Sequence, residues 1–181
     1  HLWPDTAAVW ENDALFLPDE VELETLPVNP PTGGWNTLQT ATTKIVELPA
    51  TVEQYYWGEF GYRPYTNEYY FEKDDPQVKN GNYKGVSWWW REIFIPSDWQ
   101  NKKILLHVRG ARLRAEVYLN EKLVGYHIIT ETAFSCDLTS AVKPGTRNLL
   151  AIRITNPGGE MDWMDTKLHH WGTYEFHMGH G

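Results

Sequence analysis

Apolar residues recur at every second position in short segments of the second half of the chain, from Gly85 onwards. In the segment 103–109, Ile104, Leu106 and Val108 follow this period, which is typical of a strand with one buried face. Similar segments, rich in β-branched, aromatic or alternating residues, are 87–95, 114–119, 122–128 and 149–155. Because turn residues join them and no helical segments intervene, the pattern predicts an all-β fold of antiparallel sheets packed as a sandwich or jelly roll.

The first half of the chain has a less regular pattern. Residues 1–34 are rich in proline and acidic residues, which predicts an extended arm that lies along a larger body. Residues 44–48 are expected to form a short strand, and 52–57 either a helical turn or an aromatic strand. Residues 58–85 are expected to form a long aromatic loop without a sustained period. We therefore expect one domain over 1–181.

Charge and length exclude several functions. The chain has 16 basic and 24 acidic residues and a formal net charge of -8, which disfavours nucleic acid and anionic membrane surfaces as partners. It has no apolar run of about 18 residues that would span a bilayer. Cys136 is the single cysteine, so no intrachain disulfide forms, and its strand context predicts a small buried thiol. The first ten residues lack the features of a signal peptide, which suggests a processed or excised segment.

Aromatic residues are numerous, with 10 Trp, 10 Tyr and 6 Phe. Large aromatic side chains either fill a core or present flat faces to ligands and partners. We expect core packing to account for the larger share, because buried aromatics stabilise mainly through the area that they remove from water.

Six sequence features occur in a particular order in the second half of the chain. They are Gly85 with Trp89-Trp90-Arg91, Phe94, Pro96 and Trp99; Leu105 and Gly110; Ala115-Glu116-Val117-Tyr118-Leu119-Asn120-Glu121-Lys122 with Val124 and Gly125; Phe134 with Asp137-Leu138-Thr139; Pro144-Gly145 with Asn148; and Ala151-Ile152-Arg153-Ile154 before Asn156. This order resembles the N-terminal sugar-binding domain of glycoside hydrolase family 2. Glu121 stands where the family hairpin has glycine, so a type I′ turn is disfavoured and a longer or bulged turn is expected.

The resemblance implies a galactose-binding-like jelly roll that accompanies an immunoglobulin-like domain and a catalytic TIM barrel. Such enzymes cleave β-galactosides, β-glucuronides or β-mannosides, and retaining hydrolysis needs two carboxyl groups about 5 to 5.5 Å apart. In the family these are barrel glutamates, and the barrel is absent from this chain, which we expect to be inactive alone. No cofactor is implied. A periplasmic or secreted location is expected from the resemblance only.

The segment 156–181 holds the candidate substrate-binding residues. In related enzymes a loop at this place brings an acidic residue to the substrate pocket, and Asp162 or Asp165 is that residue by position. Trp163 or Trp171 is then expected to stack on the apolar face of a sugar ring while the carboxylate accepts hydrogen bonds from hydroxyls. The alternative is that both tryptophans cover the edge of the sandwich.

Other polar clusters favour structural roles. Four histidines, His169, His170, His177 and His180, do not have the spacing of a zinc site, so we expect an interface and no native metal. Three arginines, Arg91, Arg112 and Arg114, either pair with carboxylates in the sandwich or bind an acidic sugar, and the first role is favoured.

Two further functions stay open from the sequence. An independent carbohydrate-binding module would use exposed aromatic residues such as Trp57, Tyr62 and Tyr65 as its platform. A protein-interaction domain without a sugar role is the third possibility, because sandwiches support many functions.

Overall fold

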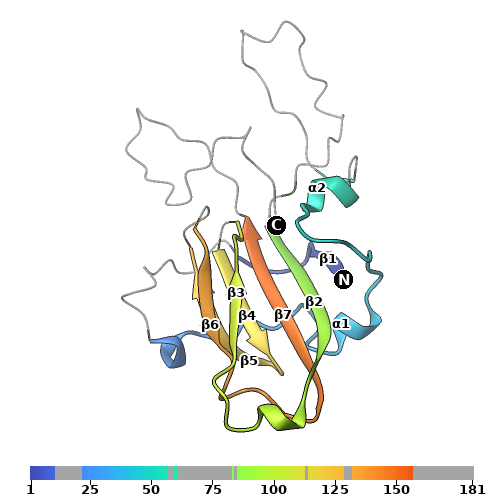
Figure 1. Cartoon of the computed structure of the whole chain (residues 1–181). Coiled ribbons are helices and arrows are strands. Elements are labelled where there is room, and N and C mark those ends of the chain that lie inside the picture. The colour runs from blue at the N-terminus through green and yellow to red at the C-terminus, as the bar shows by residue number, and fades with distance from the viewer. Residues whose placement is uncertain are drawn as a thin grey trace, which may run out of the picture.

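Two antiparallel sheets form the fold in the computed structural model, which describes residues 1–10, 22–56, 59–60, 83, 85–112, 114–128 and 132–156. The larger sheet has five strands in the order β1-β2-β7-β4-β5, and the smaller sheet pairs β3 with β6 (Figure 1). The strands are β1 (Leu2–Asp5), β2 (Gly85–Ile95), β3 (Leu105–Val108), β4 (Arg114–Leu119), β5 (Lys122–His127), β6 (Phe134–Asp137) and β7 (Thr146–Asn156). The helical turns are η2 (Leu23–Thr25), α1 (Thr37–Thr40), α2 (Val52–Tyr55) and η3 (Ser97–Trp99), and none of these described helices has the length needed to cross a membrane. The predicted all-β sandwich is confirmed.

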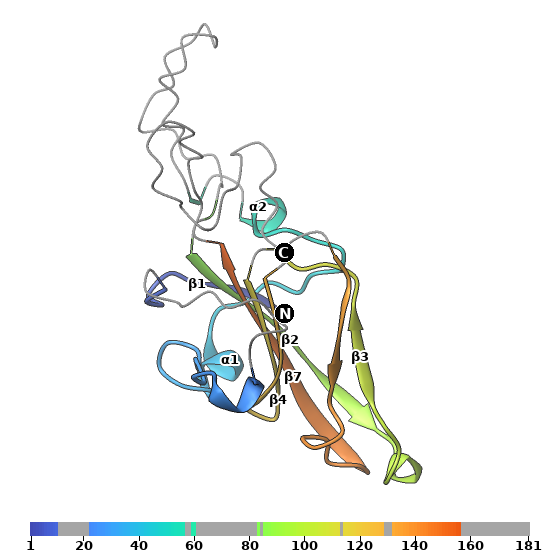
Figure 2. The ribbon, with the colours of Figure 1, turned by 90° about the vertical axis from the view of Figure 1, so that its left-hand side faces the viewer.

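Both faces of the five-stranded sheet are covered. Figure 2 shows β3 on one side of this sheet and α1 on the other. On the face towards β3 and β6, which we call the sandwich face, Val117 and Leu119 pack with Cys136. On the opposite face, the arm face, Trp35 packs edge-on against Trp88 and Tyr118, with ring centroids 5.6 and 5.1 Å apart. All six residues of β4 are consequently buried, whereas alternation alone indicated one buried face.

The arm face is covered by the N-terminal part of the chain. Leu26 and Leu38 are buried there against the Trp88 cluster, and the amide of Asn29 donates a hydrogen bond to the Tyr118 hydroxyl at 3.1 Å. The described residues of the predicted arm 1–34 include one regular element of the sheet that the sequence pattern did not indicate. Leu2–Asp5 forms β1 and extends the sheet beyond β2, because edge pairing needs backbone groups more than a recognisable side-chain pattern.

The segment 44–56 crosses the sandwich face beside β1. The predicted strand 44–48 is wrong: it makes a single bridge, Lys44 to Leu2, after which Ile45 and Leu48 are 82% and 74% exposed. Of the two possibilities for 52–57, the helical turn is observed as α2. A capping box starts it, in which the Gln54 amide donates to Thr51 Oγ1 at 3.3 Å and the Thr51 amide donates to Gln54 Oε1 at 2.7 Å. The predicted loop 58–85 lies largely outside the described residues.

The hairpin between β4 and β5 turns in two residues. Asn120 and Glu121 have φ of 50° and 71°, and Leu119 pairs with Lys122, so the tight turn expected to be disfavoured by Glu121 is retained. The bulge lies within the strands, where the register shifts between Val117 and Tyr118. The Asn120 side chain holds the turn, since it donates to Asn148 Oδ1 at 2.7 Å and accepts from the Leu149 amide at 3.1 Å.

Replacing Glu121 by glycine is expected to raise the free energy of unfolding by about 0.5–1 kcal/mol, because glycine adopts positive φ without the steric cost of a Cβ. Glu121→Ala serves as the control, since alanine retains the Cβ and should give no gain. Urea unfolding of the three proteins measures the difference. Equal stabilities of the glycine and alanine variants would show that the turn is not strained at this position.

Candidate functional site

One end of the sandwich is defined by the starts of three strands, and we call it the loop end. The pairs Gly85–Asn156, Arg114–Thr155 and Val108–Phe134 show that β2, β4 and β6 begin there, while β7 and β3 end there. It is the upper end of the sheets in Figure 1. The segment that follows β7 therefore starts from this end.

The predicted site residues lie in that following segment. Asp162, Trp163, Asp165 and Trp171 are outside the described residues, and their roles stay predictions. The same holds for His169, His170, His177 and His180, and for the aromatic platform Trp57, Tyr62 and Tyr65. In the described part of the chain, no group of three or more His, Cys, Asp or Glu residues is arranged to hold a metal ion.

Aromatic residues and one amide stabilise the base of the loop end. The buried Tyr83 hydroxyl donates to the Val86 carbonyl at 2.6 Å, and Asn156 Nδ2 donates to the Tyr83 carbonyl at 3.3 Å. Phe60 packs against the Tyr83 ring at 4.8 Å. Burial, together with the charge of Asp5, raises the pKa of Tyr83, so its phenol stays neutral and acts as a structural donor. The last residue of β7 is thus firmly held where the following segment begins.

A buried ionic network lies on the arm face. Glu116, 1% exposed, accepts from Arg153 Nη1 at 2.6 Å through Oε2 and from Arg114 Nη2 at 3.3 Å through Oε1. Asn29 Nδ2 donates to the same Oε1 at 2.7 Å from the arm. Burial and the nearby Glu116 charge raise the pKa of Tyr118, whose hydroxyl also donates to Glu116 at 3.4 Å. The network is buried, and Asn29 joins it to the arm.

The three candidate arginines therefore separate by location. Arg114 is buried in the Glu116 network and has the favoured structural role. Its carboxylate partner lies two residues away on the same strand, and not across the sandwich. Arg91 is exposed and Arg112 is half-buried, and neither makes an ion pair among the described residues. A role for these two in binding an acidic sugar stays a prediction.

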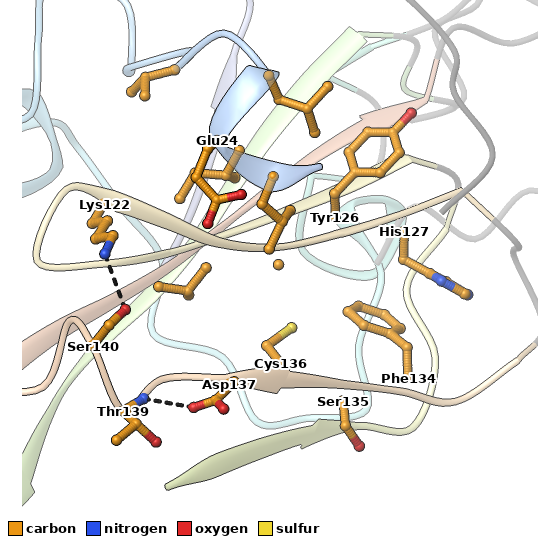
Figure 3. A pocket seen from close by; sticks show the side chains of 16 residues that line it. Glu24, Lys122, Tyr126, His127, Phe134, Ser135, Cys136, Asp137, Thr139 and Ser140 are labelled. Atoms are coloured by element: carbon orange, nitrogen blue, oxygen red, sulfur yellow. Dashed lines mark hydrogen bonds between the residues drawn. The ribbon is translucent and has the colours of Figure 1, made fainter. Parts of the chain in front are cut away.

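A groove of about 840 Å³ runs along the outer flank of the sandwich (Figure 3). Its lining combines residues from β5, from β6 and the turn after it, and from the arm: Leu23, Glu24, Leu26, Val28, Lys122, Leu123, Val124, Gly125, Tyr126, His127, Phe134, Ser135, Cys136, Asp137, Thr139 and Ser140. At one end Lys122 Nζ donates to Ser140 Oγ at 3.0 Å and links β5 to the turn after β6. At the other end the His127 and Phe134 rings stack with centroids 4.4 Å apart.

The groove was missed by sequence reasoning. It depends on arm residues 23–28 lying beside β5, a contact between segments about a hundred positions apart that no local pattern indicates. Cys136, by contrast, is the small buried thiol that its strand context predicted. Burial raises the pKa of Cys136 to about 12, so the thiol is protonated at neutral pH and is no nucleophile.

Comparison with known proteins identifies relatives for most of the chain. The family model described as glycosyl hydrolases family 2, sugar binding domain, matches residues 7–171. The β-galactosidase of Thermoanaerobacter pseudethanolicus is 31% identical over 87 residues, which are 48% of this chain and 11% of that protein. A β-glucuronidase of Bacteroides fragilis is 30% identical over 81 residues, which are 45% of this chain and 12% of that protein.

Solved structures of similar proteins align either with a short part of this chain or with a longer part at lower sequence identity. A β-D-glucuronidase of Dictyoglomus thermophilum is 31% identical with a TM-score of 0.41, over 41% of this chain and 13% of that one. The Ruminococcus gnavus β-glucuronidase is 20% identical with a TM-score of 0.48, over 67% and 19% of the two chains. The aligned part of the chain thus covers about a tenth of the length of these curated relatives. Because the family model covers residues 7–171 of 181, the chain belongs to glycosyl hydrolase family 2, as its sugar binding domain.

Proposed function

We propose that this chain is the accessory domain of a β-glycosidase whose catalytic residues lie on a TIM barrel that follows an immunoglobulin-like domain in a longer polypeptide. The observation that carries the proposal is the match of the family 2 sugar binding domain to nearly the whole chain. The names and lengths of the relatives support it, since they are β-galactosidases and β-glucuronidases of which the aligned part covers only 11–12%. A secreted or periplasmic location is part of this proposal.

The two buried carboxylates of the described part have structural partners. Retaining hydrolysis needs two carboxyl groups about 5 to 5.5 Å apart, one of which must donate a proton to the glycosidic oxygen. Glu116 is held by two guanidinium groups under the arm, and Asp5, the other buried carboxylate of the described part, accepts from the Thr32 amide at 2.9 Å. Neither is accessible for proton transfer to a substrate. Both catalytic carboxyl groups are proposed to come from the barrel, which the family match supports.

The domain would act through the segment that leaves the loop end. In this proposal Asp162 or Asp165 accepts hydrogen bonds from sugar hydroxyls at the rim of the barrel pocket, and Trp163 or Trp171 stacks on the ring. The firm anchoring of Asn156 by Tyr83 and by pairing with Gly85 gives that segment a rigid origin, which a positioning role requires.

The test is made on the longer polypeptide in which this chain precedes a barrel. Replacing Asp162 and Asp165 together by asparagine is expected to lower kcat/KM about tenfold or more, because each charge-assisted hydrogen bond to a hydroxyl is lost or weakened. Rates are measured with p-nitrophenyl β-galactoside and p-nitrophenyl β-glucuronide. Asp98→Asn, in η3 at the opposite end of the sandwich, is the control. Unchanged kinetics in the double variant would remove the proposed role of this segment.

A further inference from the structure

We propose that the outer edge of β3, the edge away from β6, accepts an extended acidic segment from a later part of the same longer polypeptide, as a third strand of the small sheet. The inference rests on the proposed function only in that the chain continues into further domains. In the described part of the chain, β3 pairs with β6 alone. Backbone groups on an open edge are available to pair with another strand.

The hydrogen-bonding pattern shows which backbone groups of β3 point outwards. The Leu138 amide donates to the Ile104 carbonyl at 2.9 Å, and residue pairs along an antiparallel ladder alternate between bonded and non-bonded. Leu105 and His107 are therefore the non-bonded positions of β3, and their N–H and C=O groups point away from β6. No other described residue bonds to these backbone groups, so they are open to an added strand.

The face of the large sheet beside this edge is not fully covered. β6 lies against β5 through Cys136 and Gly125, and β3 is the next strand of the small sheet towards β7 and β2 (Figure 1). On the sandwich face Val117 of β4 is fully buried, but Leu150 of β7 and Ile93 of β2 are only half-buried. A strand added to β3 would lie about 4.8 Å further on, above β7 and β2, and would cover these aliphatic side chains.

Two arginines near this edge favour an acidic segment. Arg109 is exposed directly after β3, and Arg91 is exposed on the sandwich face, two residues before Ile93 and opposite Leu150. Neither guanidinium makes an ion pair with a described residue. A carboxylate on the inward face of the added strand would pair with Arg91, and aliphatic residues at its other inward positions would pack on Leu150 and Ile93.

Charge and edge length favour a tethered segment over a separate molecule. In a second copy, pairing of β3 with β3 about Leu106 would set Lys103 opposite Arg109, and like charges in opposite positions are destabilising. Leu105 and His107 offer one N–H and one C=O each, too few to offset the lost translational and rotational freedom of a free partner. A segment of the same polypeptide avoids most of that loss through its high effective concentration.

The test is hydrogen exchange, measured by mass spectrometry at single-amide resolution, on the 181-residue chain and on the longer polypeptide. The Leu105 and His107 amides are expected to exchange at least about tenfold more slowly in the longer polypeptide, because each gains an acceptor there. Amides of η3, which lies outside this edge, are the internal control and should exchange at similar rates in the two proteins.

A proline variant distinguishes strand pairing from simple coverage by another domain. Leu105→Pro in the longer polypeptide removes one outward donor and obstructs the added strand, but the bonds between β3 and β6 remain because the Leu105 amide points away from β6. The His107 amide is then expected to exchange as fast as in the 181-residue chain. Leu105→Ala retains the backbone donor and should retain the slow exchange of His107.

Three results would overturn the inference: equal exchange of the Leu105 and His107 amides in the two proteins, slow exchange of His107 that survives Leu105→Pro, or slow exchange that appears in the 181-residue chain as its concentration rises, which would assign the edge to a second copy. Slow exchange of β4 and β7 amides shows that each variant is folded. The accessory role stands or falls separately, because it is measured by the kinetics of the Asp162 and Asp165 variants.

Discussion

Glu116→Ala is expected to lower the free energy of unfolding by about 3–5 kcal/mol, because it leaves two buried guanidinium groups without their shared counter-charge. Arg114 and Arg153 are 2% and 3% exposed, so water cannot replace the carboxylate. Asn29 also loses its acceptor, which weakens the attachment of the arm. Urea unfolding followed by tryptophan fluorescence measures the loss, because Trp88 of β2 and Trp35 of the arm pack together on the arm face, where Glu116 also lies.

A surface ion pair provides the matched control. Glu92 and Arg147 are also bonded at 2.9 Å, but their side chains are 57% and 75% exposed. Glu92→Ala is expected to cost less than about 1 kcal/mol, because water solvates the remaining guanidinium. Similar losses of stability in Glu116→Ala and Glu92→Ala would mean that burial does not increase the contribution of the Glu116 network to the free energy of unfolding. Glu116→Gln retains an acceptor without the charge, so its loss of free energy of unfolding is expected to lie between those of Glu116→Ala and Glu92→Ala.

The strands of the central sheet were predictable because their side chains carry the necessary pattern. β2, β4, β5 and β7 were all expected within a few residues of their bounds, since each has alternating or β-branched character and ends at a turn residue. β1 was not expected, because it depends on an open edge of β2. The burial of the second face of β4 was also not expected, because alternation indicates one buried face and the arm that covers Glu116 is distant in sequence.

A candidate site was predictable from the sequence where a motif indicates it, and was not predictable where distant segments form it. The order of motifs identified the family, and so directed attention to Asp162 and Asp165 without any contact being known. The flank groove has no motif, since it exists only where arm residues such as Leu26 approach β5 and β6. The turn at Glu121 shows the reverse case: a local rule disfavoured the tight turn, but the side chain of Asn120 and its bonds to the β7 region retain it.

Gly125→Ala is expected to lower the free energy of unfolding by about 2–3 kcal/mol, in the upper part of the usual cost of overpacking. A Cβ on Gly125 would lie 2.1 Å from the Cys136 sulfur, 3.0 Å from its Cβ and 3.4 Å from the Val117 Cβ. Cys136 is buried between the two sheets, so β5 and β6 would have to separate. Burial raises the pKa of the Cys136 thiol to about 12, and separation should expose it, so faster reaction with a thiol reagent at pH 8 gives a second readout.

A double variant distinguishes this specific clash from a general intolerance of β5. Cys136→Gly removes the two atoms nearest to the new methyl group and leaves only the 3.4 Å approach to Val117. Gly125→Ala should therefore cost at least about 1 kcal/mol less in the Cys136→Gly background than alone, which is the coupling expected for residues in contact. Gly110→Ala, where an added Cβ meets nothing within 4 Å, should change stability by less than about 0.5 kcal/mol. Additive losses in the double variant would place the requirement for glycine in the backbone of β5 and not in its contact with β6.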